Sequence, residues 1–188
     1  LAGIAASMSG KGVAARGGLP ALDENQWSEA WADLGGGFGA SAGSDRMSFT
    51  LRTLTDPKLL AAALQLGARQ LGEPAFPDDV WQRERQRYAA SLREEMTRPA
   101  SVAGRAYSAA VYSGHPYGYE TTEESLARIA TSDMRDWFST YLRPCRAKVS
   151  IVGDVTRAQA DSIATALLAR LPQSACEPLP AVAEVPAL

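Results

Sequence analysis

The chain contains one histidine, His115, and this count limits the chemistry that its side chains can do. His115 lies in the loop Ser113-Gly-His-Pro-Tyr-Gly118, where glycine and proline favour a turn. It would act as a general base only beside a nucleophile, and no serine or cysteine here has a nucleophile motif around it. We therefore expect no catalytic residue and interpret His115 as structural or solvent-facing, with a binding role as the alternative.

The two cysteines, Cys145 and Cys176, lie far apart in the sequence. Neither belongs to a C-x-x-C pair, and a single histidine cannot complete a zinc knuckle with them. The pattern favours two unpaired thiols and leaves a disulfide open as the alternative. The cysteines therefore do not settle the redox compartment.

The glycines of Gly35-Gly-Gly-Phe-Gly39 resemble a phosphate-binding loop only in composition. A dinucleotide-binding turn follows a strand and opens a helix, so that phosphate meets a helix N-terminus. Here the glycines follow a predicted helix and precede a predicted strand. We interpret them as a helix C-cap followed by a closely packed strand.

The composition is that of a folded globular protein. Of 188 residues, 46% are hydrophobic and 21% are charged, and this length suits one domain. The formal net charge of -2 gives no overall basic field, so we expect no nucleic-acid partner. No apolar run reaches the roughly 18 residues of a membrane span. The chain begins with leucine and shows no signal peptide, so we expect it to be a fragment whose location this absence does not decide.

Hydrophobic periodicity and capping residues predict the secondary structure that must position any site. Asp23 with Gln26, Asp56 with Pro57, Asp78 and Ser132 mark helix starts. Met47, Phe49 and Leu51 alternate with polar residues, as in a half-buried strand. The four tryptophans lie at helical spacing with other apolar residues, which predicts core packing. Helices are expected over 2–10, 24–34, 57–71, 79–97, 99–112, 122–130, 132–141 and 156–171, and strands over 38–42, 47–51 and 148–152.

This order predicts an α+β fold, a layered domain with helices packed on a mixed, mostly antiparallel sheet. Three strands are few for this much helix, so we expect at least one more strand before Leu1. From Pro172 onward the chain is rich in proline, alanine and glutamate, which is typical of a linker. The predicted organisation is a domain over 1–172 and a linker or tail over 173–188 that leads toward an absent second domain.

Six short segments, in order, resemble the pitrilysin and mitochondrial processing peptidase family, the inverted zincins. None is specific alone, but their order and spacing extend over nearly all of the chain before the tail. They are Leu34-Gly-Gly-Gly-Phe-Gly-Ala-Ser, Pro74-Ala-Phe-Pro, Arg83-Glu-Arg-Gln-Arg, Gly114-His-Pro-Tyr-Gly, Tyr141-Leu-Arg-Pro and Ile151-Val-Gly-Asp-Val.

The resemblance implies where a zinc site would lie. Active members carry H-x-x-E-H on the first helix of this layout and a third ligand, a glutamate, on the later long helix. Gly3-Ile-Ala-Ala-Ser7 stands at the motif position, so Gly3, Ala6 and Ser7 replace the two histidines and the general base. Glu84 matches a retained glutamate, but Ser91 stands at the third ligand position. We therefore expect no metal, no cofactor and no peptidase activity of its own.

The strand after the glycines has a possible binding role. In active relatives this edge strand pairs with the substrate backbone and carries an Asn-Ala pair, which Gly39 and Ala40 match here. The resemblance implies residual peptide contact through Gly39, Ala40, Ser41 and Ala42. The alternative is ordinary structural pairing of the strand.

The resemblance implies a non-catalytic, peptidase-like domain that pairs with an active zinc peptidase of the same family. Such pairs enclose a polypeptide substrate between their halves, and bacterial members are commonly exported, which implies the periplasm. Two alternatives remain open from the sequence. One is a stand-alone peptide-binding module, and the other is a zinc-dependent peptidase whose ligands come from elsewhere.

Overall fold

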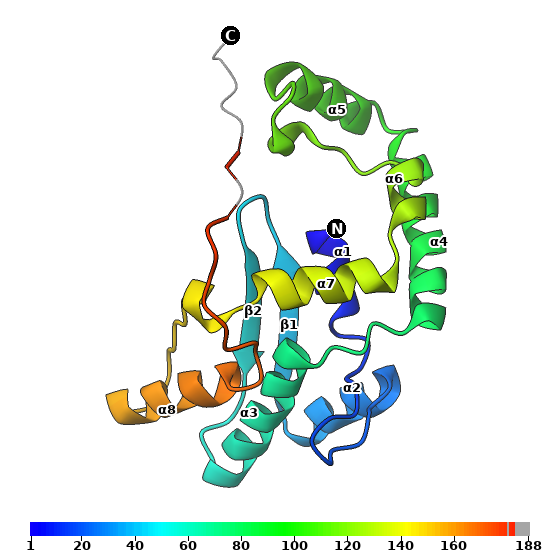
Figure 1. Cartoon of the computed structure of the whole chain (residues 1–188). Coiled ribbons are helices and arrows are strands. Elements are labelled where there is room, and N and C mark those ends of the chain that lie inside the picture. Colours follow the sequence, from blue (N-terminus) through cyan, green and yellow to red (C-terminus); the bar gives the residue numbers. More distant parts are fainter. Residues whose placement is uncertain (180, 183–188) are drawn as a thin grey trace. The chain divides into compact units, whose positions relative to one another are not determined.

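The computed structural model describes residues 1–179 and 181–182, which divide into two compact units. The first contains Leu1–Asp78 and Ala130–Cys176, and the second contains Asp79–Ile129 and the described residues after Cys176. Figure 1 shows the elements in their order along the chain. They are α1 (Ala2–Met8), α2 (Glu24–Asp33), β1 (Gly37–Ala42), β2 (Met47–Arg52), α3 (Pro57–Gly72), α4 (Asp78–Glu95), α5 (Pro99–Val111), η1 (Pro116–Gly118), α6 (Glu123–Arg128), α7 (Thr131–Tyr141), η2 (Pro144–Arg146) and α8 (Arg157–Leu168).

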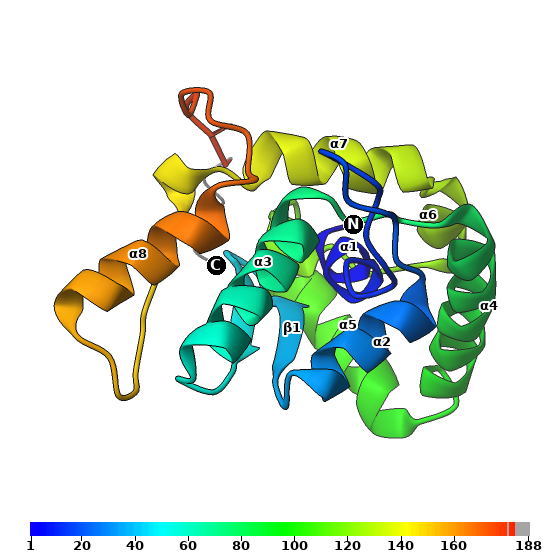
Figure 2. The ribbon, with the colours of Figure 1, turned by 90° about the horizontal axis from the view of Figure 1, so that it is seen from below.

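The first unit is built around an antiparallel hairpin of β1 and β2, which confirms the α+β class. The register pairs Ala42 with Met47 and Gly37 with Arg52. The Gly43 N–H donates to the Arg46 carbonyl at 2.9 Å and closes the turn at 44–45. Helix α1 lies against β1 and α7, α2 packs on β1, and α3 runs beside α8 (Figures 1 and 2).

Two of the predicted helix starts are capped as expected, and a third is not. The Asp23 carboxylate accepts from the N–H of Gln26, whose side chain accepts from the Asp23 N–H, so the capping box of α2 is confirmed. Asp56 caps α3. The prediction of Ser132 as a cap was wrong, because α7 begins one residue earlier. There the Ala130 N–H donates to the Asp133 carboxylate at 2.8 Å, which satisfies the helix entry without a serine.

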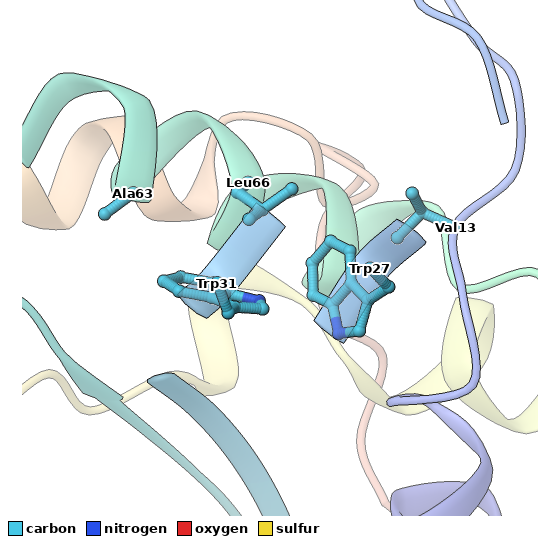
Figure 3. Packing of buried hydrophobic residues seen from close by; sticks show 5 residues of the cluster. All are labelled: Val13, Trp27, Trp31, Ala63 and Leu66. Atoms are coloured by element: carbon cyan, nitrogen blue, oxygen red, sulfur yellow. The ribbon is translucent and has the colours of Figure 1, made fainter. Parts of the chain in front are cut away.

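The core of the first unit is a series of aromatic rings that runs from α2 through the hairpin to α7. Neighbouring ring centroids lie between 5.1 and 6.3 Å apart, in stacked, tilted or edge-to-face geometry. Trp27 and Trp31 of α2 also pack against Val13, Ala63 and Leu66, as Figure 3 shows. The series contains Trp27, Trp31, Phe38, Phe49, Phe138 and Phe76.

A glycine permits the close packing between the end of α3 and the chain after α8. A Cβ at Gly72 would overlap the backbone carbonyl of Arg170. The Arg170 side chain also forms an ion pair with Glu73, whose own side chain is only 2% exposed. Arg69 lies 3.5 Å from the same carboxylate and donates to the carbonyl of Ala14 at 3.0 Å. This buried ion network therefore joins α3 to two other segments of the same unit.

The Pro74-Ala-Phe-Pro segment makes the turn that follows α3. Phe76 is fully buried and has a φ of 45°, in the left-handed region that a bulky residue rarely adopts. Its carbonyl accepts from the Arg135 guanidinium at 3.0 Å, and its ring lies 5.1 Å from Phe138. The strained backbone is thus held from two sides by α7. This motif has a structural explanation in the turn that it forms.

The predicted strand at 148–152 does not form. Within the described residues the sheet contains β1 and β2, and no described backbone hydrogen bond joins 148–152 to either of them. Val152 is 98% exposed and Val149 is also exposed, although the β-branched residues of this segment favour a strand. A strand requires a hydrogen-bonded neighbour, and this segment has none here.

The preference for unpaired thiols was also wrong. Cys145 in η2 and Cys176 after α8 form a disulfide, and their Cα atoms lie 6.1 Å apart. This separation lies in the usual range for a bridge. Spacing in the sequence did not reveal the pair, because α7 and α8 bring the two segments together only in the folded unit.

The second unit consists of α4, α5, η1 and α6. Trp81 is buried and its indole N–H donates to the Ile129 carbonyl at 2.9 Å, which ties the start of α4 to the segment after α6. Arg93 of α4 binds Glu123 of α6 through two hydrogen bonds of 3.0 and 2.8 Å. Met96, directly after α4, is exposed, and α5 buries none of its residues. None of the described helices has the length and apolar character of a membrane span.

Candidate functional site

The positions at which the resemblance places H-x-x-E-H lie on α1. Gly3 and Ser7 are exposed and one turn apart on the same face of the helix, whereas Ala6 is 3% exposed and faces the core. A Cβ at Gly3 would have no atom within 4 Å. The first turns of α1 are held by Ile4, Ala5 and Met8, which are buried. The helix therefore presents two solvent-facing positions whose side chains offer no imidazole or carboxylate.

The third ligand position lies on α4. Ser91 is exposed, and Glu84 lies two turns earlier on the same face. The Glu84 side chain is 15% exposed and accepts from Arg87 at 3.0 Å, so this carboxylate has a partner on its own helix. Gly3, Ala6 and Ser7 belong to the first unit and Ser91 to the second. Among the residues that the structure describes, no group of three or more His, Cys, Asp or Glu side chains is placed to hold a metal ion.

The remaining carboxylates near Ser91 are engaged in ion pairs. Glu94 pairs with Arg98, and Glu95 lies 3.8 Å from Arg105. The two hydrogen bonds from Arg93 lower the pKa of the Glu123 carboxyl below its usual range, and the same contact raises the pKa of Arg93. Both side chains are solvent-exposed, so this pair is a surface contact between α4 and α6.

The candidate peptide-binding strand, Gly39–Ala42, lies in β1, whose second edge is open in the described sheet. The hydrogen bond between Gly43 and Arg46 fixes which residues face β2, because paired and unpaired positions alternate in an antiparallel ladder. By this alternation Gly39 and Ser41 direct their backbone groups toward β2. Ala40 and Ala42 direct theirs toward the open edge.

The structure adds Phe38 to the candidate strand. It has the same parity as Ala40 and Ala42, so its N–H and C=O also face the open edge. Its ring packs against Trp31 and Phe49, which fixes the strand from the core side. The turn at 44–45 is the feature of the sequence that could have identified Phe38. A two-residue hairpin turn fixes which residues of β1 direct their backbone groups toward β2 and which direct them outward. The open edge, defined as the outward backbone groups of Phe38, Ala40 and Ala42, is the candidate functional site.

His115 has a local structural role in the second unit. Its Nδ1 accepts the N–H of Tyr117 at 3.2 Å and caps the η1 turn. The imidazole also packs edge-on against the Tyr117 ring, with centroids 4.5 Å apart. The structural interpretation explains both contacts of His115.

The sequence matches no protein-family model and no curated protein. Solved structures share its fold at low identity. The inactive domain of an M16 peptidase from Pseudomonas fluorescens has a TM-score of 0.84 at 24% identity, over 93% of this chain and 42% of that one. The periplasmic protease PqqL from Escherichia coli has a TM-score of 0.75 at 18% identity, over 100% of this chain and 20% of that one.

Pitrilysin has a TM-score of 0.73 at 20% identity, over 98% of this chain and 19% of its own length. The chain therefore spans less than half the length of each of these proteins. The similarity extends over nearly all of this chain and includes the helices and the hairpin described above. The chain has the fold of the pitrilysin-like peptidase domains.

Proposed function

We propose that the chain is a non-catalytic, pitrilysin-family domain that pairs with an active zinc peptidase and helps to enclose a polypeptide substrate. The observation that carries this proposal is the surface of α1. The exposed face on which active members carry two histidines has Gly3 and Ser7 instead. The buried position between them is Ala6, so the general base of the motif is replaced as well. Loss of ligands and base together is what a non-catalytic role predicts.

The peptide-binding part of the proposal rests on the open edge of β1. Unpaired backbone groups at a sheet edge accept an extended peptide as an added strand, and this contact needs no particular side chain. Ala40 and Ala42 have small side chains, which leave the backbone accessible to a strand. The proposed substrate is therefore an unstructured polypeptide, bound through its own backbone.

The disulfide and a structural neighbour both support an exported location. Disulfides persist in oxidising compartments such as the bacterial periplasm and are rare in the cytosol. The bond between Cys145 and Cys176 is compatible with that environment. One of the structural neighbours is itself described as a periplasmic protease. We place the proposed function in the periplasm on these two grounds.

The test is reconstitution with a homologue that retains H-x-x-E-H. The full-length subunit that contains this domain is mixed with that homologue, and kcat/KM is measured on an unstructured peptide. We expect a complex by size exclusion and a higher kcat/KM, because a second half restricts the bound peptide and positions it at the zinc. The matched control is the same subunit carrying Ala40→Pro, which removes one outward N–H.

The outcomes of this experiment distinguish the partner role from the two alternatives. A complex whose activity rises less with the Ala40→Pro subunit supports both the pairing and the edge contact. Absence of a complex together with unchanged activity contradicts the partner role. Peptide binding by the isolated chain, measured by fluorescence anisotropy, would then favour the stand-alone binding module. Activity of the mixture that survives mutation of the homologue's H-x-x-E-H would point to catalysis by the present chain.

A further inference from the structure

The disulfide stands where the chain leaves the first unit. Residues up to Cys176 belong to that unit, and the described residues that follow belong to the second. Cys145 is in η2, the short helix that follows α7, so the bridge joins the exit point to this element. The bond therefore attaches the end of one short segment, residues 172–176, to η2. We call these residues the exit segment.

The contacts that hold the chain change at Leu171. Leu171 is buried, and the neighbouring Arg170 pairs with the buried Glu73, so the chain is fixed to the core up to this residue. Beyond it, none of the described backbone hydrogen bonds involves residues 172–176. The Gln173 amide donates back to the Leu171 carbonyl at 2.9 Å and to the Leu168 carbonyl at the end of α8 at 3.3 Å, so its contacts stay within five residues along the chain. The exit segment therefore lacks a backbone attachment to the rest of the unit.

Two interactions join the exit segment to η2 and its entry. One is a hydrogen bond from the Arg143 guanidinium to the Ser174 hydroxyl, and the other is the disulfide. Ser174 is exposed, so water competes for its hydrogen bond, and such a contact contributes little to order. The covalent bond is the stronger of the two constraints. Cys145 is exposed and Cys176 is partly exposed, so a soluble reductant has access to the sulfur atoms.

We propose that the Cys145–Cys176 disulfide is a redox-sensitive anchor. When the bond is formed, it holds the exit segment on η2, and its reduction releases residues 172–176 while the aromatic core stays folded. The proposal does not depend on a peptidase partner or on peptide binding. It assigns the bond a local role, because the rings of the core are ordered by their own packing on one face of the hairpin.

The chemistry requires a dithiol reductant, such as dithiothreitol or a thioredoxin-like C-x-x-C protein. One thiolate of the dithiol attacks a sulfur of the bridge, breaks the S–S bond and forms a mixed disulfide. The second thiolate then attacks the mixed disulfide and closes its own ring. Cys145 and Cys176 leave as two thiols, and the dithiol is oxidised to a disulfide, having given up two electrons and two protons.

The release would lengthen the connection to whatever follows the first unit. An extended chain spans at most about 3.3–3.6 Å per residue, so freeing the exit segment adds roughly 17 Å of reach. The attachment point would move from Cys176 back to the buried Leu171. Prolines at 172 and 178 stiffen this stretch, so the added length would act as a semi-rigid spacer.

The test measures backbone order in the whole chain by ¹⁵N relaxation, before and after reduction with dithiothreitol. We expect the order parameter at Ser174 and Ala175 to fall from about 0.8 to below about 0.6 on reduction. The values at Met134 and Phe138 should not change, because these residues are buried in the core. Cys145→Ser/Cys176→Ser should match the reduced protein and show no response to the dithiol.

Ser174→Ala is the matched control, since it removes the Arg143 contact and leaves the bridge intact. Its exit segment should stay ordered until the dithiol is added. Three results would overturn the proposal: order at Ser174 that survives reduction, loss of order throughout the core on reduction, or disorder in Ser174→Ala while the bond is intact. An intact mass that shows two free thiols in protein purified without reductant would also exclude it.

Discussion

At the scale of single residues, the degenerate positions on α1 are informative because of where they face. Gly3 and Ser7 are exposed, and a larger side chain at Gly3 would meet no neighbour. Packing therefore does not explain why these positions lack histidine. Ala6 differs, since it is buried, and a glutamate there would place a carboxylate in an apolar environment.

We predict that the purified chain binds no stoichiometric zinc. Gly3→His/Ser7→His should gain weak zinc binding, because two imidazoles one helical turn apart on an exposed face can share one metal ion. Ser7→His alone is the matched control and should bind much less. Elemental analysis after dialysis measures the metal content. A wild-type value of about one zinc per chain that persists in His115→Ala would contradict the proposed loss of the site.

The contact between Arg93 and Glu123 gives a prediction about pH. The hydrogen bonds from Arg93 lower the pKa of Glu123, so Arg93→Ala should return that pKa upward to the usual glutamate range. A lowered folded-state pKa stabilises the protein above the unfolded-state pKa, and this contribution disappears as the pH falls through the folded value. Because both groups are exposed, the effect on unfolding should be small. A ¹³C NMR titration of the Glu123 carboxyl measures the shift, and an unchanged pKa in Arg93→Ala would refute it.

At the scale of elements, local signals predicted most helices and both strands of the hairpin. The capping box at Asp23 and the alternation at Met47, Phe49 and Leu51 act over a few residues, so the sequence contains the information needed. The segment 148–152 is rich in β-branched residues but forms no strand, because pairing depends on a neighbour that no local pattern specifies. The Cys145–Cys176 bond was missed for the same reason.

The candidate site was likewise predicted only in part from the sequence. The resemblance located Gly39–Ala42, but only the register shows that the backbone groups of Ala40 and Ala42 face outward while those of Gly39 and Ser41 face β2. Phe38 joins the edge through the same parity. The positions on α1 and α4 were assigned from the sequence, and their exposure required the folded chain.

Backbone groups of successive β1 residues alternate between the open edge and β2. Proline substitutions at the neighbouring positions 40 and 41 should therefore have different effects. Ala40→Pro removes an outward N–H and should leave the fold intact while it weakens binding of an extended peptide. Ser41→Pro removes an N–H that faces β2, so it should destabilise the hairpin. Thermal unfolding and peptide anisotropy on both variants test the assignment. A loss of stability in Ala40→Pro that equals or exceeds the loss in Ser41→Pro would contradict the assigned parity.

Alanine substitutions at two helical glycines should change the stability of the chain in opposite directions. Gly72→Ala should destabilise the chain by about 1–3 kcal/mol, because its Cβ would overlap the Arg170 backbone and force α3 away from the chain after α8. Gly104→Ala in α5 has open space around it and should stabilise that helix by about 0.5–1 kcal/mol. Urea unfolding gives both values. A neutral Gly72→Ala would mean that this close approach is not maintained in solution.

At the scale of the whole molecule, the fold is that of a peptidase domain, while the candidate site is a strand edge made of backbone groups. We predict that the chain alone hydrolyses no peptide bond, because the positions that the family resemblance assigns to the metal ligands and the general base hold other residues. Incubation with an unstructured polypeptide, followed by mass spectrometry, measures this. Cleavage that survives repurification and is abolished by a point mutation in this chain would contradict the prediction.

The division into units also has a consequence for how the chain folds. The first unit is assembled from two stretches separated by the insert 79–129, so contacts such as Phe76 with Phe138 close a long loop. Loop closure costs entropy that short-range helices do not incur, and non-local contacts of this kind slow folding. The β1–β2 hairpin is local and needs no such closure. During synthesis on the ribosome, the hairpin and its adjoining helices can therefore form first, and the ring series is completed only after α7 has emerged.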